Sequence, residues 1–183
     1  LQYAHDRGVV LVASMGNSGR DEVFYPSGYS TTIGVGSSTA DDELSRFSTY
    51  NDFVDLVAPG QDILSLRAAG TDLYADAGEP GVHIVADKYL IASGTSMSSP
   101  HAAGAAAVLL SFAPGLSNER VREIFRASSD DIVDPFGNDS LNLPGFDRHT
   151  GAGRINLERA IALLPGVLLE VTSHPYGARL SGE

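Results

Sequence analysis

Residues 94–110 set the strongest limit on the fold of this chain. They open with Gly94-Thr95-Ser96-Met97-Ser98-Ser99-Pro100-His101 and continue through alanine, glycine, valine and leucine. Small side chains with high helix propensity predict a helix that packs closely on all sides, and therefore a buried central helix. Ser96 fits its N-cap, and Pro100 lies in or near the first turn, where a missing N–H costs little. Unpaired N–H groups and the positive dipole end would then face whatever lies over Ser96.

A serine before a helix is most often an ordinary cap, so the wider motif has to decide between capping and catalysis. The octapeptide resembles the nucleophile motif of the subtilisin-like serine peptidases (subtilases), with Ser96 at the nucleophile position. Val9–Asn17 resembles the strand of that family that ends in a Gly-Asn pair. Other segments match the family in order and approximate spacing: Tyr25-Pro26-Ser27, Ile33–Gly36, Phe47-Ser48, Val57–Gly60 and Gly151–Asn156.

This resemblance covers about residues 1–165 and fits better than two alternatives. The sedolisin relatives match less well at Asn17, Met97 and His101. The nucleophile elbow of an α/β-hydrolase would need glycine where Ser98 stands. The resemblance implies an α/β fold with a subtilisin-like parallel sheet flanked by helices, of which this chain would be the carboxyl-terminal part.

Local patterns agree with an α/β domain. Short apolar runs predict buried strands at 8–13, 32–36 and 54–57, and apolar spacing predicts helices at 117–127 and 157–164, the second capped by Asn156. Alternating strand and helix signals favour a parallel sheet. Residues 83–86 and 89–92, joined by Asp87-Lys88, predict an antiparallel hairpin that leads the chain to Ser96.

Both ends predict a longer parent protein. Leu1–Arg7 resembles the last turns of a helix that stops at Gly8, with no N-terminal cap. Val167–Thr172 alternates like a strand and is followed by a turn. We therefore expect residues 1–165 to be the C-terminal part of a catalytic domain, and residues 166–183 to be a linker and the first strand of a following β-sandwich domain.

Composition excludes several function classes. The chain has 12 Lys and Arg against 23 Asp and Glu, a formal net charge of −11, which argues against a nucleic-acid-binding surface. The sequence shows no apolar run long enough to span a membrane. The absence of cysteine excludes disulfides, thiolate metal sites and a cysteine nucleophile. A secreted or cell-surface location is implied by the family resemblance alone.

The resemblance implies a serine endopeptidase that cleaves polypeptides through an acyl-enzyme. Ser96 Oγ would attack the peptide carbonyl, the Ser96 N–H and the Asn17 side chain would hold the oxyanion, and Thr95 would support that pocket. A serine needs a histidine base and an acid that orients it. His101 lies about 140° around the helix from Ser96, so we interpret it as a helix-packing residue.

The base and the acid are expected elsewhere. No His-Gly-Thr, Asp-Thr-Gly or Asp-Ser-Gly segment occurs in the sequence. Subtilisin triads run Asp, His, Ser along the chain, so both partners would lie upstream of Leu1, in the other half of the same catalytic domain. This chain alone should then not hydrolyse peptides. The alternative is a subtilase-like pseudopeptidase that serves as a scaffold or binding module of a larger surface protein; retention of Ser96 and Asn17 argues against it.

The substrate pocket can be predicted only in outline. Its wall would be formed by Ser14, Met15 and Gly16, with Phe24 and Tyr25 from the opposite loop. Phe24 resembles the floor position of the pocket for the residue before the scissile bond, where some relatives have glycine. A bulky floor would favour small or medium side chains there. The alternative is that Phe24 turns into the core.

The chemistry requires no cofactor and we assign no metal ligand, although the resemblance implies that structural calcium can be bound. Neither acidic stretch of the chain has EF-hand spacing, and we favour solvated surface loops. We also leave Asp55 out of any ligand set. The two stretches contain Asp72, Asp76 and Glu79, and Asp130, Asp131, Asp134, Asn138, Asp139, Asn142 and Asp147.

Overall fold

A computed structural model describes residues 1–133 and 144–165. Strands β1 (Val12–Ser14), β2 (Ile33–Ser38) and β3 (Val54–Pro59) form a parallel sheet in that order. The predicted strands and the parallel sheet are confirmed, with each strand ending further along the chain than expected. Their order is not the expected strand–helix alternation, because the described segments 15–32 and 39–53 connect the strands as loops.

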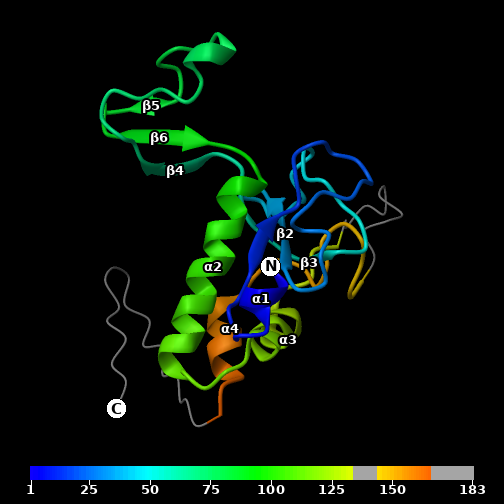
Figure 1. The fold of residues 1–183 in the computed structure, drawn as a ribbon. Coiled ribbons are helices and arrows are strands. Elements are labelled where there is room, and N and C mark those ends of the chain that lie inside the picture. Colours follow the sequence, from blue (N-terminus) through cyan, green and yellow to red (C-terminus); the bar gives the residue numbers. More distant parts are fainter. Residues whose placement is uncertain (134–143, 166–183) are drawn as a thin grey trace.

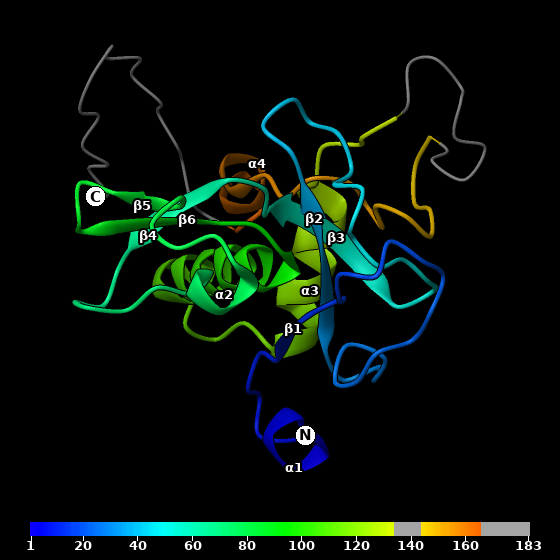
Figure 2. The ribbon, with the colours of Figure 1, turned by 90° about the horizontal axis from the view of Figure 1, so that it is seen from above.

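Three helices share one apolar core with this sheet. They are α2 (Thr95–Phe112), α3 (Asn118–Ser128) and α4 (Leu157–Ala162), and α2 contacts all three strands (Figures 1 and 2). The predicted cap Asn156 is present and accepts a hydrogen bond from Arg159 N at 2.9 Å, and the structure shows Ser117 as the cap of α3, accepting one from Arg120 N at 3.1 Å. The short helix α1 (Gln2–His5) precedes the sheet. The core contains Ile33, Val35, Leu56, Ala58, Ala102, Ala105, Ala106, Leu109, Val121, Ile124, Phe125, Ala160, Ile161 and Leu164.

Helix α2 is buried along one side only, which corrects the prediction of packing on all sides. Ala102, Ala106 and Leu109 face the core, whereas Ala103 and Ala107 are exposed in the described chain. Small residues all around a helix permit close packing everywhere, but they do not reveal which faces have a neighbour. The face that packs is fixed by the sheet.

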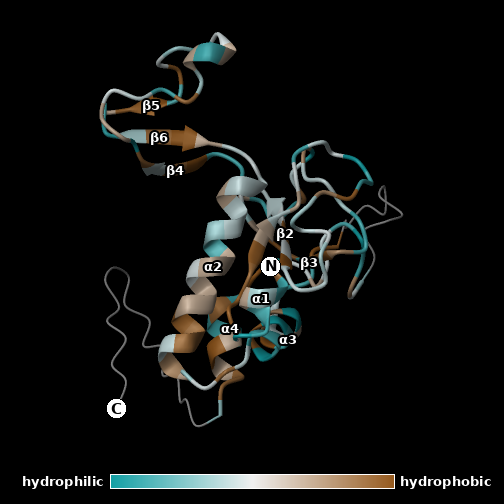
Figure 3. Cartoon of the chain, viewed as in Figure 1, coloured by the Kyte–Doolittle hydropathy of each residue, from teal (hydrophilic) through white to brown (hydrophobic). Residues whose placement is uncertain are grey.

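A second sheet projects from the start of α2, away from α3 and α4 (Figure 1). It pairs β4 (Ile63–Leu66), β6 (Tyr89–Ala92) and β5 (Ile84–Val85) in antiparallel order β4-β6-β5, and the 3-10 turn η1 (Ala75–Ala77) lies in the loop between β4 and β5. The predicted hairpin is confirmed, but its turn centres on Ala86 and Asp87, whose φ angles are 49° and 59°. Lys88 N closes the turn on Val85 O at 3.2 Å. Hydrophobic residues lie along its strands (Figure 3).

A buried ion cluster joins α3 to the edge strand β3. The pairing of β2 with β3 shifts register between Gly34 and Val35, and this irregularity leaves Asp55 without a partner in the ladder. Its fully buried carboxylate accepts Gly34 N at 2.9 Å, Arg122 at 2.7 and 2.8 Å, and Arg126 Nε at 2.7 Å. Asp55 is therefore a structural anchor between α3 and β3.

Two predictions lie outside the described residues. These are the strand at 167–172 and the domain that it would begin. Within residues 1–133 and 144–165, no helix combines the length and apolar character that crossing a bilayer requires.

Candidate active site

Helix α2 begins two residues earlier than the sequence predicts. Gly94 is its N-cap, with φ 154°, so Ser96 is the second helical residue and not the cap. Pro100 consequently lies in the second turn, where it offers no N–H to the Ser96 carbonyl. The Ser96 side chain is exposed, and its backbone N–H has no acceptor among the described residues. A free donor and an exposed hydroxyl thus share one residue at the positive end of the helix.

Asn17 comes to this helix start from the carboxyl end of β1. Its Oδ1 accepts two hydrogen bonds from Thr95, one from the backbone N at 2.9 Å and one from Oγ1 at 2.9 Å. Thr95 Oγ1 in turn accepts Gly16 N at 3.1 Å. With its oxygen occupied, the amide presents Nδ2 toward the helix start, where a Cβ on Gly94 would lie 3.3 Å from that nitrogen.

Asn17, Thr95 and Ser96 meet at the start of α2, in what we call the Asn17 corner. This arrangement of donors can stabilise a negatively charged oxygen. The Asn17 Nδ2 donor and the Ser96 N–H lie at the same helix end, and Ser96 Oγ lies beside them. Donors that are held in place before reaction stabilise an oxyanion without reorganising. The assignment of Ser96, Asn17 and Thr95 stays a prediction, and their placement is compatible with it.

Gly60 is a supporting residue whose role the sequence did not reveal. Gly94 N donates to its carbonyl at 2.7 Å, which ties the segment before α2 to the end of β3. A Cβ on Gly60 would lie 2.0 Å from Ser98 Oγ and 2.5 Å from Ser37 Oγ. Glycine is therefore required here for close approach, and the Pro59-Gly60 pair is its only signal in the sequence.

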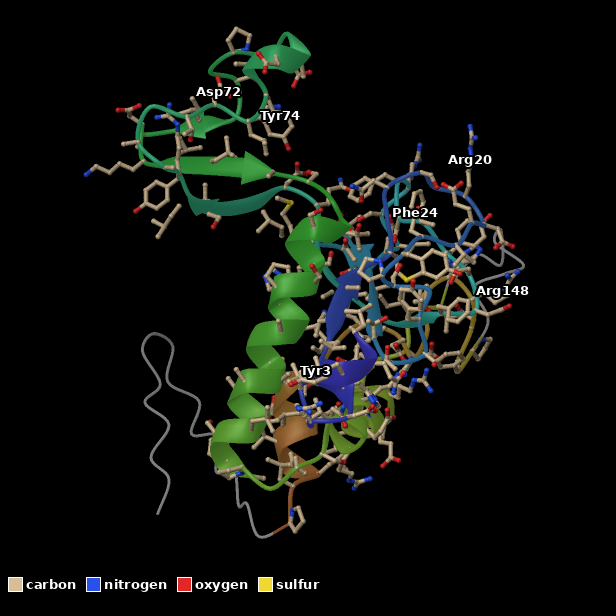
Figure 4. All side chains as sticks on the ribbon, in the orientation of Figure 1. Tyr3, Arg20, Phe24, Asp72, Tyr74 and Arg148 are labelled. Atoms are coloured by element: carbon tan, nitrogen blue, oxygen red, sulfur yellow. The ribbon has the colours of Figure 1, made fainter. Side chains whose placement is uncertain are left out.

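The predicted substrate wall is partly assembled. The Phe24 ring packs over Gly16, since a Cβ there would lie 2.7 Å from Phe24 Cδ2. Phe24 and Tyr25 are 42% and 65% exposed, so Phe24 does not turn into the core. It lies in the loops beside the β1–β3 sheet, on the same side as Arg20 and Arg148 (Figure 4). Two residues of the wall differ from each other: the Ser14 side chain is half-buried and the Met15 side chain is fully buried.

Met15 therefore offers at most its backbone to a pocket. A Cβ on Gly34 would lie 2.8 Å from Met15 Sδ, which places the thioether against β2 and not in the predicted wall. The reason is the alternation of side chains along a strand, which sends Met15 to the face opposite its two neighbours.

No described histidine is hydrogen-bonded to Ser96. His5 pairs with Glu119 at 2.8 Å, His83 pairs with Glu79 at 2.8 Å, and the buried His149 ring stacks on Tyr50 at 3.9 Å. His101 Nδ1 contacts Met97 O at 2.8 Å. His101 is exposed, which corrects its interpretation as a helix-packing residue.

The acidic stretches make local hydrogen bonds where they are described. Asp72 lies in the projecting loop near Tyr74 (Figure 4), and hydrogen bonds from Gly81 N and Tyr74 N lower the pKa of its carboxyl. Burial opposes ionisation of Asp130, but hydrogen bonds from Arg154, Asn156 and Arg159 outweigh it and lower its pKa. Within residues 1–133 and 144–165, no three His, Asp or Glu side chains gather as a metal would require. Asp134, Asn138, Asp139 and Asn142 lie outside those ranges.

Comparison with known proteins adds independent support for the family. The model of the subtilase family matches residues 1–153. A thermophilic serine proteinase of Bacillus sp. (strain AK1) is 38% identical over 132 residues, which are 72% of this chain and 28% of that protein. Thermitase of Thermoactinomyces vulgaris is 33% identical over 161 residues, which are 88% of this chain and 47% of that protein.

A solved structure agrees with these matches. The prenylagaramide maturation protease PagA superposes with a TM-score of 0.70 at 25% identity, over 90% of this chain and 54% of that chain. The chain spans about half the length of these relatives or less. Since the family model covers most of its residues and the two sequence relatives exceed 30% identity over more than two thirds of it, this chain belongs to the subtilase family.

Proposed function

We propose that the protein containing this chain is a serine endopeptidase, with Ser96 as nucleophile. The observation that supports this best is the pair of Thr95 hydrogen bonds to Asn17 Oδ1, which turns the amide nitrogen toward the Ser96 helix start. The Asn17 amide and the Ser96 N–H form the oxyanion site, and Thr95 fixes it. Polypeptides are the substrates.

The reaction follows from these roles. Ser96 Oγ attacks the scissile carbonyl carbon while a histidine takes the hydroxyl proton. The carbonyl oxygen becomes an oxyanion between Asn17 Nδ2 and the Ser96 N–H. Collapse of the intermediate breaks the C–N bond, and the histidine returns the proton to the leaving amine. Water then attacks the acyl-enzyme by the same route and releases the acid and free Ser96.

The histidine and the aspartate come from a segment of the same catalytic domain that lies outside this sequence. Two observations support this part: none of the described histidines bonds to Ser96, and the relatives are at least twice as long as their match. The partner of this chain is thus the other half of its own domain.

Sequencing the gene upstream of the Leu1 codon tests the proposal directly. We expect an Asp-Ser-Gly or Asp-Thr-Gly segment followed by His-Gly-Thr. Full-length protein should then cleave peptides, and Ser96→Ala should abolish cleavage while leaving the unfolding temperature unchanged. An intact upstream half without both segments would make the protein a pseudopeptidase scaffold, the alternative function.

The pocket for the residue before the scissile bond is narrowed by Phe24. Its ring contacts Gly16 in the segment that leads to Asn17, and it is partly exposed there. We expect peptides with alanine at that position to be cleaved faster than those with phenylalanine. Phe24→Gly should raise kcat/KM for the phenylalanine peptide about tenfold, the scale on which pocket volume discriminates. Equal rates for both peptides in the wild type would contradict this.

The protein acts outside the cytoplasm or at the cell surface. One relative, 31% identical over 169 residues, is the cell wall-associated protease of Bacillus subtilis (strain 168). Fractionation of the native host tests the location. The chemistry needs no cofactor, and a structural calcium ion would show itself as an unfolding temperature that falls when a chelator is added.

A further inference from the structure

We infer that Thr49 is a positioning residue that fixes the backbone of Asn17. This inference rests on the proposed function, because it explains how the oxyanion donor is held. Thr49 lies in the loop between β2 and β3, far from Asn17 in the sequence, and is fully buried.

Thr49 bonds to both peptide groups that flank Asn17. Its N–H donates to Gly16 O at 3.0 Å, and Gly16 O belongs to the peptide before Asn17. Its Oγ1 accepts Ser18 N at 3.0 Å, and Ser18 N belongs to the peptide after Asn17. The two peptide planes on either side of one Cα define its φ and ψ. A single residue thus fixes the direction in which the Asn17 side chain leaves the backbone.

The Thr49 hydroxyl is also satisfied as a donor or acceptor. Ser18 Oγ lies 2.9 Å from Thr49 Oγ1, so the hydroxyl has two partners in the same turn. A buried group with its hydrogen bonds made resists displacement, because moving it would leave polar atoms unpaired. These hydrogen bonds therefore restrain the backbone at Asn17, from which the proposed oxyanion donor extends.

The two hydrogen bonds by which Thr49 holds the peptides on either side of Asn17 form what we call the Thr49 clamp. This clamp is itself anchored to strand β2 of the parallel sheet. Ser48, the residue before Thr49, accepts Ser37 N of β2 through its Oγ at 3.0 Å. Gly19 N donates to Phe47 O at 2.8 Å, so the Asn17 turn and the Thr49 loop are joined a second time. The position of Asn17 is therefore fixed relative to strand β2 of the core, and not only relative to the loop that carries Thr49.

Thr49 and Thr95 hold different parts of Asn17 in place. Thr49 holds the backbone of Asn17, while Thr95 holds the Oδ1 end of its amide. Because a donor must be held at about 2.7–3.1 Å from the position of the developing oxyanion, loss of either should reduce kcat. Substrate binding in the ground state does not use this donor, so KM should change little.

The test uses the full-length protein with Thr49→Val, Thr49→Ser, Asn17→Ala and the double variant Asn17→Ala/Thr49→Val. Valine keeps the branched shape and the backbone N–H but removes the acceptor for Ser18 N. Thr150→Val is the matched control, because Thr150 is a fully buried threonine whose hydroxyl bonds to Asp147. The substrate is a chromogenic peptide anilide.

We expect Thr49→Val to lower kcat about tenfold with KM within twofold, and Thr49→Ser to restore kcat. In the Asn17→Ala background, Thr49→Val should have no further effect on kcat. Thr150→Val should lower the unfolding temperature and leave kcat unchanged. An equal loss of kcat from Thr49→Val in both backgrounds would overturn the inference, because Thr49 would then act independently of Asn17.

Amide hydrogen exchange separates this inference from the proposed function. Thr49→Val should accelerate exchange of the Ser18 N–H, and Thr49→Ser should leave it slow, whether or not the protein is a catalyst. Unchanged exchange in Thr49→Val would overturn the clamp even in an active enzyme. An inactive wild type with fast Ser18 exchange in Thr49→Val would instead overturn the proposed function and support the clamp.

Discussion

The Asn17 corner and the projecting sheet β4-β6-β5 differ in the interactions that hold them together. At the corner, partly buried hydrogen bonds join residues that are distant in sequence, such as Thr95 to Asn17 and Thr49 to Gly16. In the projecting sheet, antiparallel backbone pairing joins β4 to β6, and the hydrophobic side chains of Leu64 and Leu66 are 55% and 82% exposed (Figure 3).

This difference has a physical consequence. A polar network that is shielded from water is costly to disturb. Each broken hydrogen bond leaves a donor or acceptor that no water molecule can reach to replace the lost partner. A sheet with exposed side chains loses little when one of them changes. Precise placement of a donor requires the first kind of construction, so the corner is where we expect mutations to be most damaging.

The largest effect should come from glycine replacement at the corner. Gly60→Ala would place a Cβ 2.0 Å from Ser98 Oγ, and we expect a loss of about 3 kcal/mol or more of unfolding free energy. Gly70→Ala, in the projecting loop, meets nothing within 4 Å and should cost only the strain of its φ of 77°, about 1 kcal/mol. Chemical denaturation of both variants measures the difference. Equal losses of unfolding free energy in the two variants would show that the corner is no more sensitive to substitution than the projecting loop.

A smaller effect is expected from the Thr95 hydroxyl. Thr95→Val removes the bond to Asn17 Oδ1 and the acceptor for Gly16 N, which should cost about 2 kcal/mol of unfolding free energy. Thr95→Ser keeps both bonds and serves as the control. Thermal unfolding compares the two, and a valine variant as stable as the serine variant would show that these bonds contribute nothing net.

The next effect is a dependence on pH. Hydrogen bonds from Arg154, Asn156 and Arg159 outweigh burial and hold the pKa of Asp130 below the ordinary aspartate value of 3.8. The unfolded chain then binds more protons in acid than the native one, so this contribution to stability is full above that value and is lost as the pH falls through the lowered pKa. Asp130→Asn should therefore flatten the acid limb of the stability profile. An unchanged slope between about pH 5 and pH 2 would contradict this.

The same measurement compares Asp130, which lies between α3 and α4, with a carboxylate of the projecting loop. Asp72 in the projecting loop also has a lowered pKa, but it is only half-buried and its hydrogen bonds come from two backbone N–H groups, those of Gly81 and Tyr74. Water screens such a group, so we expect Asp72→Asn to change the acid limb less than Asp130→Asn does.

The smallest effect is expected on the surface of the projecting sheet. Leu66→Ser should change the unfolding free energy by no more than about 0.5 kcal/mol, because the side chain is 82% exposed. Peptidase activity of the full-length protein should also stay the same. A loss of several kcal/mol would show that another part of the protein covers this sheet.

The sequence by itself determined which elements form and which family they belong to. Helix periodicity, the cap Asn156, the hairpin before α2 and the ordered motifs around Asn17 and Ser96 could all be predicted, because each depends on neighbours in the chain or on a fixed spacing. The same local patterns placed the N-cap of α2 two residues late, at Ser96 instead of Gly94, since a glycine cap leaves no side-chain signal.

The tertiary structure decided what lies against what. It buried the Met15 side chain, exposed His101 and laid Phe24 over Gly16. It also brought Arg122 and Arg126 to Asp55, and Thr49 to both sides of Asn17. These contacts join segments tens of residues apart, and no local pattern encodes them, because they arise only when the sheet and helices have packed and every buried polar atom must find a partner.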